Sequence, residues 1–291
     1  MTPQLRAALA TRYGLPATAI HQVPGGVANH AYTLGDDLFL RIPRNNQFEQ
    51  DLLKEAAVIP AARAAGVRTP AIVDFDTTRT LVDAPYMVSE RVHGTDLVDA
   101  AEPPATFWQD LGNQLALLHH QAEQPPGLEP DDGGDPRPTV DGLASAGYVD
   151  SGTATWLLAA FDHLQTLIPR NQPQVLLHGD VALQNLMAHG NRLQGLVDWG
   201  DAAWGPPGME FAKLQLDQVV ATLNGYHRSE GLEASILWFH LGWGLGNLTK
   251  SPQPGQRHWT APPASRLLGV LRFYASSPPP PWAGLIKKPG H

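Results

Sequence analysis

Residues 176–185 read Leu-Leu-His-Gly-Asp-Val-Ala-Leu-Gln-Asn, and residues 193–201 read Leu-Gln-Gly-Leu-Val-Asp-Trp-Gly-Asp. Each stretch begins with a short apolar run that is typical of a buried strand. Asp180 and Asn185 follow the first run, and Asp198 follows the second. Because buried strands that end in polar residues place those residues at one edge of a compact unit, the sequence predicts that these three side chains lie together.

Two carboxylates and a carboxamide form an oxygen-only ligand set, which suits the hard cation Mg²⁺ and does not suit zinc. Phosphoryl transfer needs such a set. One carboxylate orients the attacking hydroxyl and accepts its proton, while the other ligands hold the metal that neutralises the triphosphate. Either aspartate alone would equally suit the cap of a turn or a strand. The complete spacing, with His178-Gly179 directly before Asp180, favours chemistry.

These two stretches resemble the aminoglycoside phosphotransferase/choline kinase family of small-molecule kinases. Protein kinases have the same order of Asp, Asn and Asp, but Gly179 stands where they usually carry Arg, which favours the small-molecule branch. The resemblance covers roughly residues 20–215. It implies an α+β, bilobal protein kinase-like fold with a small sheet-rich N-lobe and a larger, mainly helical C-lobe. We expect a nucleotide-binding lobe over residues 1–92 and a catalytic and acceptor-binding lobe over residues 93–291.

The resemblance also implies a role for each residue of the cluster. Asp180 would be the catalytic base, and Asn185 and Asp198 would be the Mg²⁺ ligands beside bound ATP. His178 would brace the catalytic loop rather than take part in the chemistry. The Asp with which the family usually stabilises this loop is absent, and Glu210 is its expected replacement.

The N-terminal third contains the residues that the resemblance assigns to the nucleotide. Gly25, Gly26 and Asn29 belong to a Pro-Gly-Gly-Val-Ala-Asn loop, where small residues let backbone N–H groups approach phosphate. An ordinary turn between strands would have the same composition. Arg41 stands where many kinases have the lysine that contacts the α- and β-phosphates, and Glu55 matches its acidic partner. Arg is longer than Lys, but it is permanently charged and bidentate, so it can contact phosphate.

Residues 86–94 read Tyr-Met-Val-Ser-Glu-Arg-Val-His-Gly and resemble the linker between the two lobes. The resemblance implies that backbone groups of Ser89 and Arg91 meet the adenine edge and that Val88 lies near the base. An edge strand leaving a sheet would have the same backbone.

Hydrophobic periodicity and turn residues predict a mainly β segment followed by a mainly α segment. Pro60 should kink the helix that contains it or shift its start. The final 41 residues contain nine prolines, which indicates an extended end. The predicted strands cover 21–23, 31–34, 38–42, 72–75, 86–92, 175–177, 186–188 and 193–197; the predicted helices cover the N-terminus up to a turn at 14–16, and then 47–65, 106–120, 154–167, 209–224 and 232–248.

Composition excludes several classes of protein. The 291 residues are 43% hydrophobic, which is enough for a sizeable core, and the absence of cysteine excludes disulfides, zinc–thiolate sites and cysteine nucleophiles. The formal net charge of −8 disfavours a nucleic-acid or anionic membrane partner. The N-terminus lacks the apolar core of a signal peptide, and the most apolar stretch, 235–248, is too short to span a bilayer. We therefore expect a cytoplasmic protein with no membrane and no nucleic-acid partner.

The charge is unevenly distributed, and its position bears on the acceptor. Acidic and basic residues balance over residues 1–92, so all of the excess negative charge falls in the C-terminal part. A negative lobe attracts cations and repels anions. We therefore expect a small hydroxylated acceptor that is cationic or neutral.

The sequence favours an ATP-dependent phosphotransferase that acts on a hydroxyl of an aminoglycoside-like compound, an amino alcohol or a sugar. Two alternatives stay open. A protein kinase-like activity is disfavoured by Gly179 and by the lack of a peptide-docking segment after Asp198. A nucleotide-binding pseudokinase or scaffold is favoured by Arg41 and by the unusual Gly-Pro-Pro at 205–207, but the complete catalytic cluster argues against it.

Overall fold

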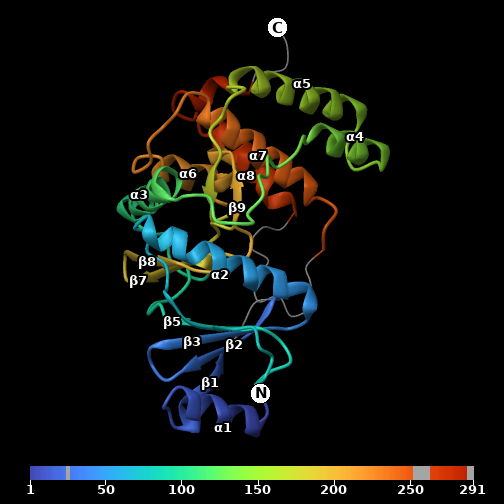
Figure 1. Cartoon of the computed structure of the whole chain (residues 1–291). Helices are drawn as coiled ribbons and strands as arrows, with labels where there is room; N and C mark the ends of the chain where they lie inside the picture. The colour runs from blue at the N-terminus through green and yellow to red at the C-terminus, as the bar shows by residue number, and fades with distance from the viewer. Residues whose placement is uncertain (24–26, 252–262, 287–291) are drawn as a thin grey trace.

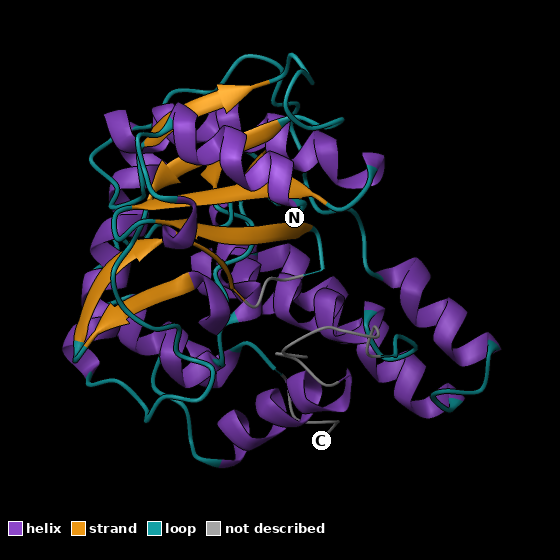
Figure 2. Cartoon of the chain, turned by 90° about the horizontal axis from the view of Figure 1, so that it is seen from below, coloured by secondary structure: helices purple, strands orange, loops and turns teal. Residues whose placement is uncertain are grey.

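One antiparallel sheet forms the centre of the smaller, N-terminal lobe. The computed structural model describes residues 1–23, 27–251 and 263–286, and its five-stranded sheet has the order β1-β2-β3-β5-β4 (Figure 1). Figure 2 shows strands of this sheet running side by side. Gly35 turns the chain from β2 to β3 with a φ of +64°, a left-handed conformation that glycine adopts without strain. The strands are β1 (Ile20–Val23), β2 (Asn29–Leu34), β3 (Leu38–Pro43), β4 (Ile72–Asp76) and β5 (Tyr86–Glu90).

Two helices cover opposite faces of this sheet: α1 (Pro3–Arg12) and α2 (Glu49–Ala64), the latter lying between the sheet and the larger lobe (Figure 1). A separate apolar cluster fills the α1 face and contains residues of α1, β1, β2, β3 and β5. The short helices η1 (Ala17–Ala19) and η2 (Asn46–Phe48) precede β1 and α2. The exposed Pro60 lies within α2 and does not end it.

The larger lobe is mainly helical (Figure 1). Its helices are α3 (Ala105–Gln121), α4 (Arg137–Ser145), α5 (Ser151–Leu167), α6 (Leu216–Thr222), α7 (Leu232–Gly246) and α8 (Pro263–Ala275), with short helices η3 (Leu183–Asn185), η4 (Pro207–Lys213) and η5 (Trp282–Gly284). Two short antiparallel pairs lie among them: β6 (Val175–Leu177) with β9 (Ala203–Gly205), and β7 (Leu186–His189) with β8 (Arg192–Leu196). The α+β, bilobal kinase-like fold predicted from the sequence is therefore confirmed.

A shared apolar core joins α2 to the larger lobe. Leu52 and Ile59 of α2 belong to the same buried cluster as Leu111 and Leu115 of α3. Trp199, directly after Asp198 in the sequence, is fully buried in this cluster. Because burial of apolar surface is the main favourable term in folding, this core fixes α2 relative to the segments that carry the predicted catalytic residues.

Two predictions of secondary structure were wrong, and helix α4 and strand β9 were not predicted. The continuous helix expected over 209–224 is divided into η4 and α6, because Gln215 caps α6 through a capping box with Gln218. The end of the chain is not wholly extended: α8 forms where apolar residues such as Val270 and Phe273 recur at helical spacing between prolines. Strand β9 was missed because its three residues carry no alternating pattern.

None of the helices within residues 1–23, 27–251 and 263–286 is long and apolar enough to cross a bilayer.

Candidate active site

The predicted catalytic loop, residues 178–185, begins where β6 ends, and a glycine determines its path. Gly179 has a φ of +78°, and a Cβ atom at this position would lie 2.0 Å from the backbone oxygen of Asp201. Only glycine allows this close approach without displacing the neighbouring chain. The approach brings residues 176–185 and 193–201 together, so Asp180 lies beside the segment that begins at Asp198.

His178 is fully buried, and both of its ring nitrogens hold the loop. Nε2 lies 3.1 Å from the backbone oxygen of Val197, and Nδ1 accepts the Asp180 N–H at 3.3 Å. Burial lowers the pKa of His178, and the two contacts suit a neutral ring with its proton on Nε2. The ring also packs against Trp199, with the ring centroids 4.4 Å apart. These are the contacts of a bracing side chain.

Glu210 holds the same loop through its backbone. Its Oε2 accepts the His178 N–H at 2.8 Å, and its Oε1 accepts the Gly179 N–H at 3.0 Å. His119 Nε2 lies 3.1 Å from Glu210 Oε2, and Tyr226 OH lies 2.7 Å from His119 Nδ1. Burial alone would raise the pKa of Glu210, but hydrogen bonding to His119 and the nearby histidines lower it below its ordinary value. A charged Glu210 therefore stabilises the loop in place of the absent Asp.

Asp180 and Asn185 are joined directly. Asn185 Nδ2 donates to Asp180 Oδ2 at 2.8 Å and to the Asp180 backbone oxygen at 2.9 Å. These bonds use both N–H groups of the amide and leave its oxygen for another partner. The Val197 N–H donates to the Asn185 backbone oxygen at 3.1 Å, which ties the loop to the residue before Asp198. The structure thus places the three side chains in one cluster.

Arg41 of β3 and Glu55 of α2 form a bidentate ion pair. Arg41 Nη1 donates to Glu55 Oε1 at 2.8 Å, and Nη2 contacts Oε2. Glu55 is 1% exposed, so the pair is shielded from water. Arg41 Nη1 also lies 3.4 Å from Asp198 Oδ1. The strand cation and the helix acid therefore meet each other and adjoin the catalytic cluster.

The oxygen donors of the cluster fit Mg²⁺. Asp198 has a φ of +70°, a left-handed conformation that Asp tolerates better than most residues. Although its side chain is 55% exposed, desolvation by the surrounding chain, followed by the charge of Glu55, raises the pKa of Asp198 to about 7. Several carboxylates crowded together favour a bound cation. The Asn185 amide oxygen and the Asp198 carboxylate are the residues that would hold it.

At the linker the backbone differs from the expectation. Ser89 is buried inside β5 and pairs with its neighbours in the sheet. The Arg91 N–H donates to the Asp37 backbone oxygen at 2.7 Å, so the sheet already uses the group expected to meet adenine. Over the part of the chain that the structure describes, the Val92 N–H has no hydrogen-bond partner. Pairing with the β3 side of the sheet therefore extends beyond Glu90. The backbone N–H that is free to meet adenine is that of Val92 and not that of Arg91.

The side chains of β5 also differ from the expectation. Val88 is buried in the apolar cluster on the α1 face of the sheet. Met87 belongs to the core on the opposite face, and its Sδ lies 3.7 Å from Arg41 Nη2. Successive side chains of a strand point to opposite faces, so Val88, which was expected near the base, lies on the face of the sheet away from Met87 and Arg41.

The predicted nucleotide loop is only partly described. Gly25 and Gly26 lie outside the described residues. Asn29 begins β2 and pairs with Pro43, and among the described residues its buried Oδ1 has no hydrogen-bond partner. Its role toward a phosphate stays a prediction.

Lys213 is a residue of the cluster that the sequence analysis missed. It ends η4, and its Nζ lies 2.8 Å from Asp180 Oδ1 and 3.2 Å from Asp201 Oδ2. Burial alone would lower the pKa of Lys213, but the two carboxylates raise it above its ordinary value, so the side chain is a cation. The one signal in the sequence is a lysine three residues after Glu210 in a mainly apolar run.

Comparison with known proteins bears on the same residues. A model of a phosphotransferase enzyme family matches residues 19–238, which include the whole cluster and the Arg41–Glu55 pair. The chain belongs to this phosphotransferase enzyme family. No curated protein sequence matches it.

Solved structures of similar fold cover nearly the whole phosphotransferase. An aminoglycoside 2'-phosphotransferase-IIIa with GDP is 18% identical, with a TM-score of 0.68 over 94% of this chain and 99% of that one. A spectinomycin phosphotransferase with ADP and spectinomycin is 16% identical, with a TM-score of 0.58 over 98% and 97%. A choline/ethanolamine kinase family protein from Mesorhizobium loti is 18% identical, with a TM-score of 0.57 over 97% and 96%. At these identities the likeness shows the fold.

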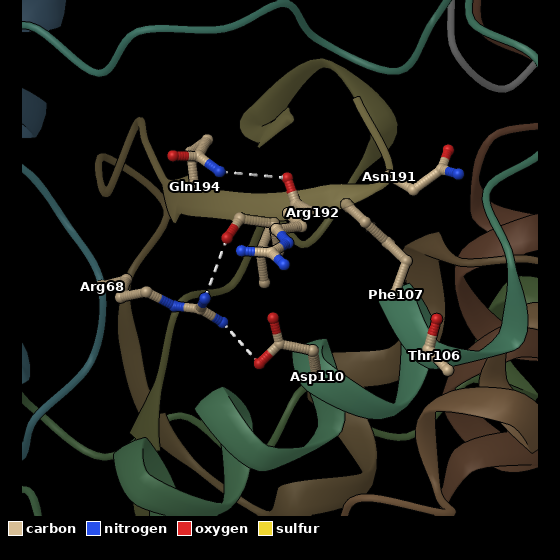
Figure 3. Close-up of a pocket in the computed structure, with 8 residues that line it drawn as sticks. Arg68, Thr106, Phe107, Asp110, Asn191, Arg192 and Gln194 are labelled. Atoms are coloured by element: carbon tan, nitrogen blue, oxygen red, sulfur yellow. Dashed lines mark hydrogen bonds and ion pairs between the residues drawn. The ribbon is translucent and has the colours of Figure 1, made fainter. Parts of the chain in front are cut away.

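A pocket of about 500 Å³ lies apart from the catalytic cluster of the phosphotransferase (Figure 3). Arg68 lies between α3 and β8 there: its Nη2 is 2.6 Å from Asp110 Oδ1, and its Nη1 donates to the Leu193 backbone oxygen at 2.9 Å. No residue that lines the pocket was predicted as a site residue, and Arg68, one of its two arginines, already pairs with Asp110. We assign no substrate to this pocket.

Proposed function

We propose that this phosphotransferase transfers the γ-phosphoryl group of ATP to a hydroxyl of a small molecule that is cationic or neutral. The observation that carries the proposal is the joining of Asp180, Asn185 and Asp198 in one cluster with the Arg41–Glu55 pair. A solved relative of the same fold binds ATP together with streptomycin, which supports ATP as the donor.

Asp180 is the base in the proposed reaction. Its carboxylate accepts the proton of the acceptor hydroxyl as the hydroxyl oxygen attacks the γ-phosphorus, and ADP leaves with the electron pair of the broken P–O bond. Asn185 orients this carboxylate through the bond to Oδ2. Mg²⁺ held by Asn185 and Asp198 would neutralise charge on the nucleotide phosphates.

The nucleotide is held from the N-terminal lobe. Arg41, oriented by its two contacts with Glu55, binds the phosphates, because a guanidinium held on one side by a carboxylate still offers other N–H donors. The adenine lies at the linker near Ser89, where the free Val92 N–H can donate to it.

The acceptor lies on the acidic side of the cluster. Asp201 is 62% exposed and is linked to Asp180 through Lys213. The acidic loop 129–135 packs on the neighbouring strand β9, where the Asp131 N–H donates to the Trp204 backbone oxygen at 2.8 Å. Negative charge on this side favours an amino sugar or amino alcohol over a carboxylate or a phosphate ester.

ATP consumption across a matched panel of hydroxylated acceptors tests the proposal. We expect the highest kcat/KM for an amine-bearing acceptor, and we expect that value to fall as salt is added, because ions screen the attraction. A highest kcat/KM for an anionic acceptor would contradict the charge argument alone. A wild-type chain that binds no ATP and consumes none with any acceptor would contradict the phosphotransferase reaction itself.

A further inference from the structure

The two oxygens of the Asp180 carboxylate are held by different donors. Asn185 Nδ2 donates to Oδ2 at 2.8 Å, and Lys213 Nζ contacts Oδ1 at 2.8 Å. Lys213 also reaches Asp201 Oδ2 at 3.2 Å. An ammonium group has three N–H donors, and these two carboxylates use two of them. The third donor is not used by any residue in the described part of the chain.

Lys213 sits on a segment that is fixed at both ends. Glu210, three residues earlier in η4, is anchored to the backbone of the catalytic loop. At the other end, Arg266 of α8 donates from Nη1 to the backbone oxygens of Ala212 and Leu214, at 2.9 Å and 3.2 Å. These bonds hold the backbone on either side of Lys213, so its ammonium group has a defined position beside the base.

The Lys213 side chain is only 20% exposed, and removal of an ammonium group from water is unfavourable unless its partners compensate. In phosphoryl transfer, negative charge is spread over the three equatorial oxygens of the transferred group. A base that touches the attacking hydroxyl lies close to those oxygens. An ammonium group held on the carboxylate of that base therefore lies where this charge develops.

We propose that Lys213 is a phosphoryl-binding cation of the reaction, an inference that rests on the proposed function. While the acceptor oxygen forms its bond to phosphorus, Asp180 takes the hydroxyl proton and ADP departs with the electron pair of the bond that breaks. Lys213 keeps its own proton throughout. Its third N–H donates a hydrogen bond to a non-bridging oxygen of the phosphoryl group during transfer, and its positive charge stabilises that group.

Calorimetric binding of ADP with and without aluminium fluoride, in the presence of Mg²⁺, tests the inference without an acceptor. Aluminium fluoride is a transition-state analogue of the transferred phosphoryl group, so it should tighten ADP binding to the wild-type protein. In Lys213→Met this tightening should fall by about 10²-fold, the usual effect of removing one preorganised donor. Binding of ADP alone should stay within about twofold. Lys250→Met, which removes an exposed lysine outside the site, should behave as the wild type.

The variants separate a phosphoryl contact from a structural role. Lys213→Arg keeps the charge and should retain part of the tightening, and Lys213→Ala should regain turnover when ethylammonium is added. If aluminium fluoride tightens ADP binding to Lys213→Met as much as to the wild-type protein, the inference is overturned. Equal loss of ADP and ADP–aluminium fluoride binding, together with a lower Tm in all three Lys213 variants, would also overturn it in favour of a structural role. If the wild-type protein binds neither ATP nor ADP, the proposed function fails and this inference fails with it.

Discussion

Asn185 donates its side-chain N–H to Asp180 Oδ2 at 2.8 Å, and this bond determines which atom of the amide is left for a metal. The nitrogen is fully used by Asp180, so the oxygen is the available ligand. In the proposed reaction the same residue would therefore orient the base Asp180 with its nitrogen and offer its oxygen to Mg²⁺.

This double role predicts that Asn185→Asp lowers turnover, although a carboxylate is a good Mg²⁺ ligand. The substituted side chain loses both donor bonds and places a second negative charge against Asp180. We expect kcat to fall by about 10²-fold, the range of a misplaced general base, even at saturating Mg²⁺. Steady-state kinetics over a Mg²⁺ series measures this, and wild-type kcat at high Mg²⁺ would contradict the orienting role.

The raised pKa of Asp198 predicts a pH-dependent metal site. The metal binds the ionised carboxylate, and a pKa of about 7 means that protons compete for it below neutral pH. Affinity of the nucleotide-free protein for Mn²⁺, followed by electron paramagnetic resonance, should rise with pH through about 7 and level off above it. Asp198→Ala should bind Mn²⁺ weakly at every pH. A flat profile in the wild-type protein would argue against this ligand.

The close approach at Gly179 predicts a large difference between two glycine substitutions. Gly190, in the turn between β7 and β8, has a φ of +56° and open space around it. Gly190→Ala should therefore lower the free energy of unfolding by about 1–2 kcal/mol, the cost of the left-handed backbone alone. Gly179→Ala adds a Cβ atom 2.0 Å from the Asp201 oxygen. It should lower the free energy of unfolding by more and abolish most turnover. Equal effects in denaturant titrations would contradict the tight packing.

The buried pair of Arg41 and Glu55 predicts unequal results for two substitutions of the arginine. Arg41→Met leaves the Glu55 carboxylate buried without its partner, which should destabilise the protein by about 3–5 kcal/mol. Arg41→Lys keeps one charged contact, so it should retain the fold and weaken ATP binding moderately, because a single ammonium group cannot replace the bidentate fork. Unfolding curves and ATP titrations measure both effects. A fully stable Arg41→Met would show that the pair does not stabilise α2.

The central residues of the candidate site could be predicted from the sequence, because they follow short strands that end in polar side chains. Asp180, Asn185 and Asp198 have this pattern, whereas the Arg41–Glu55 pair came from the family resemblance, which matches a strand cation to an acid on the next helix. The chemistry of these side chains is local to a few residues, so a single sequence contains most of it.

Other features depend on contacts between distant segments. Lys213 meets Asp180 only because η4 is held against the catalytic loop by Glu210, and the position of the lysine three residues after Glu210 does not by itself indicate this contact. The bond from Arg91 to Asp37 depends on how far β5 pairs with β3, and a shift of one residue changes which N–H is free. Such features are set by packing and register, which the sequence specifies only through the whole fold.

Asp180 is the base of the proposed ATP-dependent phosphotransfer, and Asp180→Asn tests this role most directly. The amide has almost the shape of the carboxylate but accepts no proton at neutral pH, so the fold and ATP binding should stay near those of the wild type while kcat falls by about 10²–10⁴-fold. The measurement is kcat with the best acceptor, beside ATP affinity and Tm on the same preparations. A variant that binds ATP normally and keeps near wild-type kcat would contradict the assignment of Asp180 as the base.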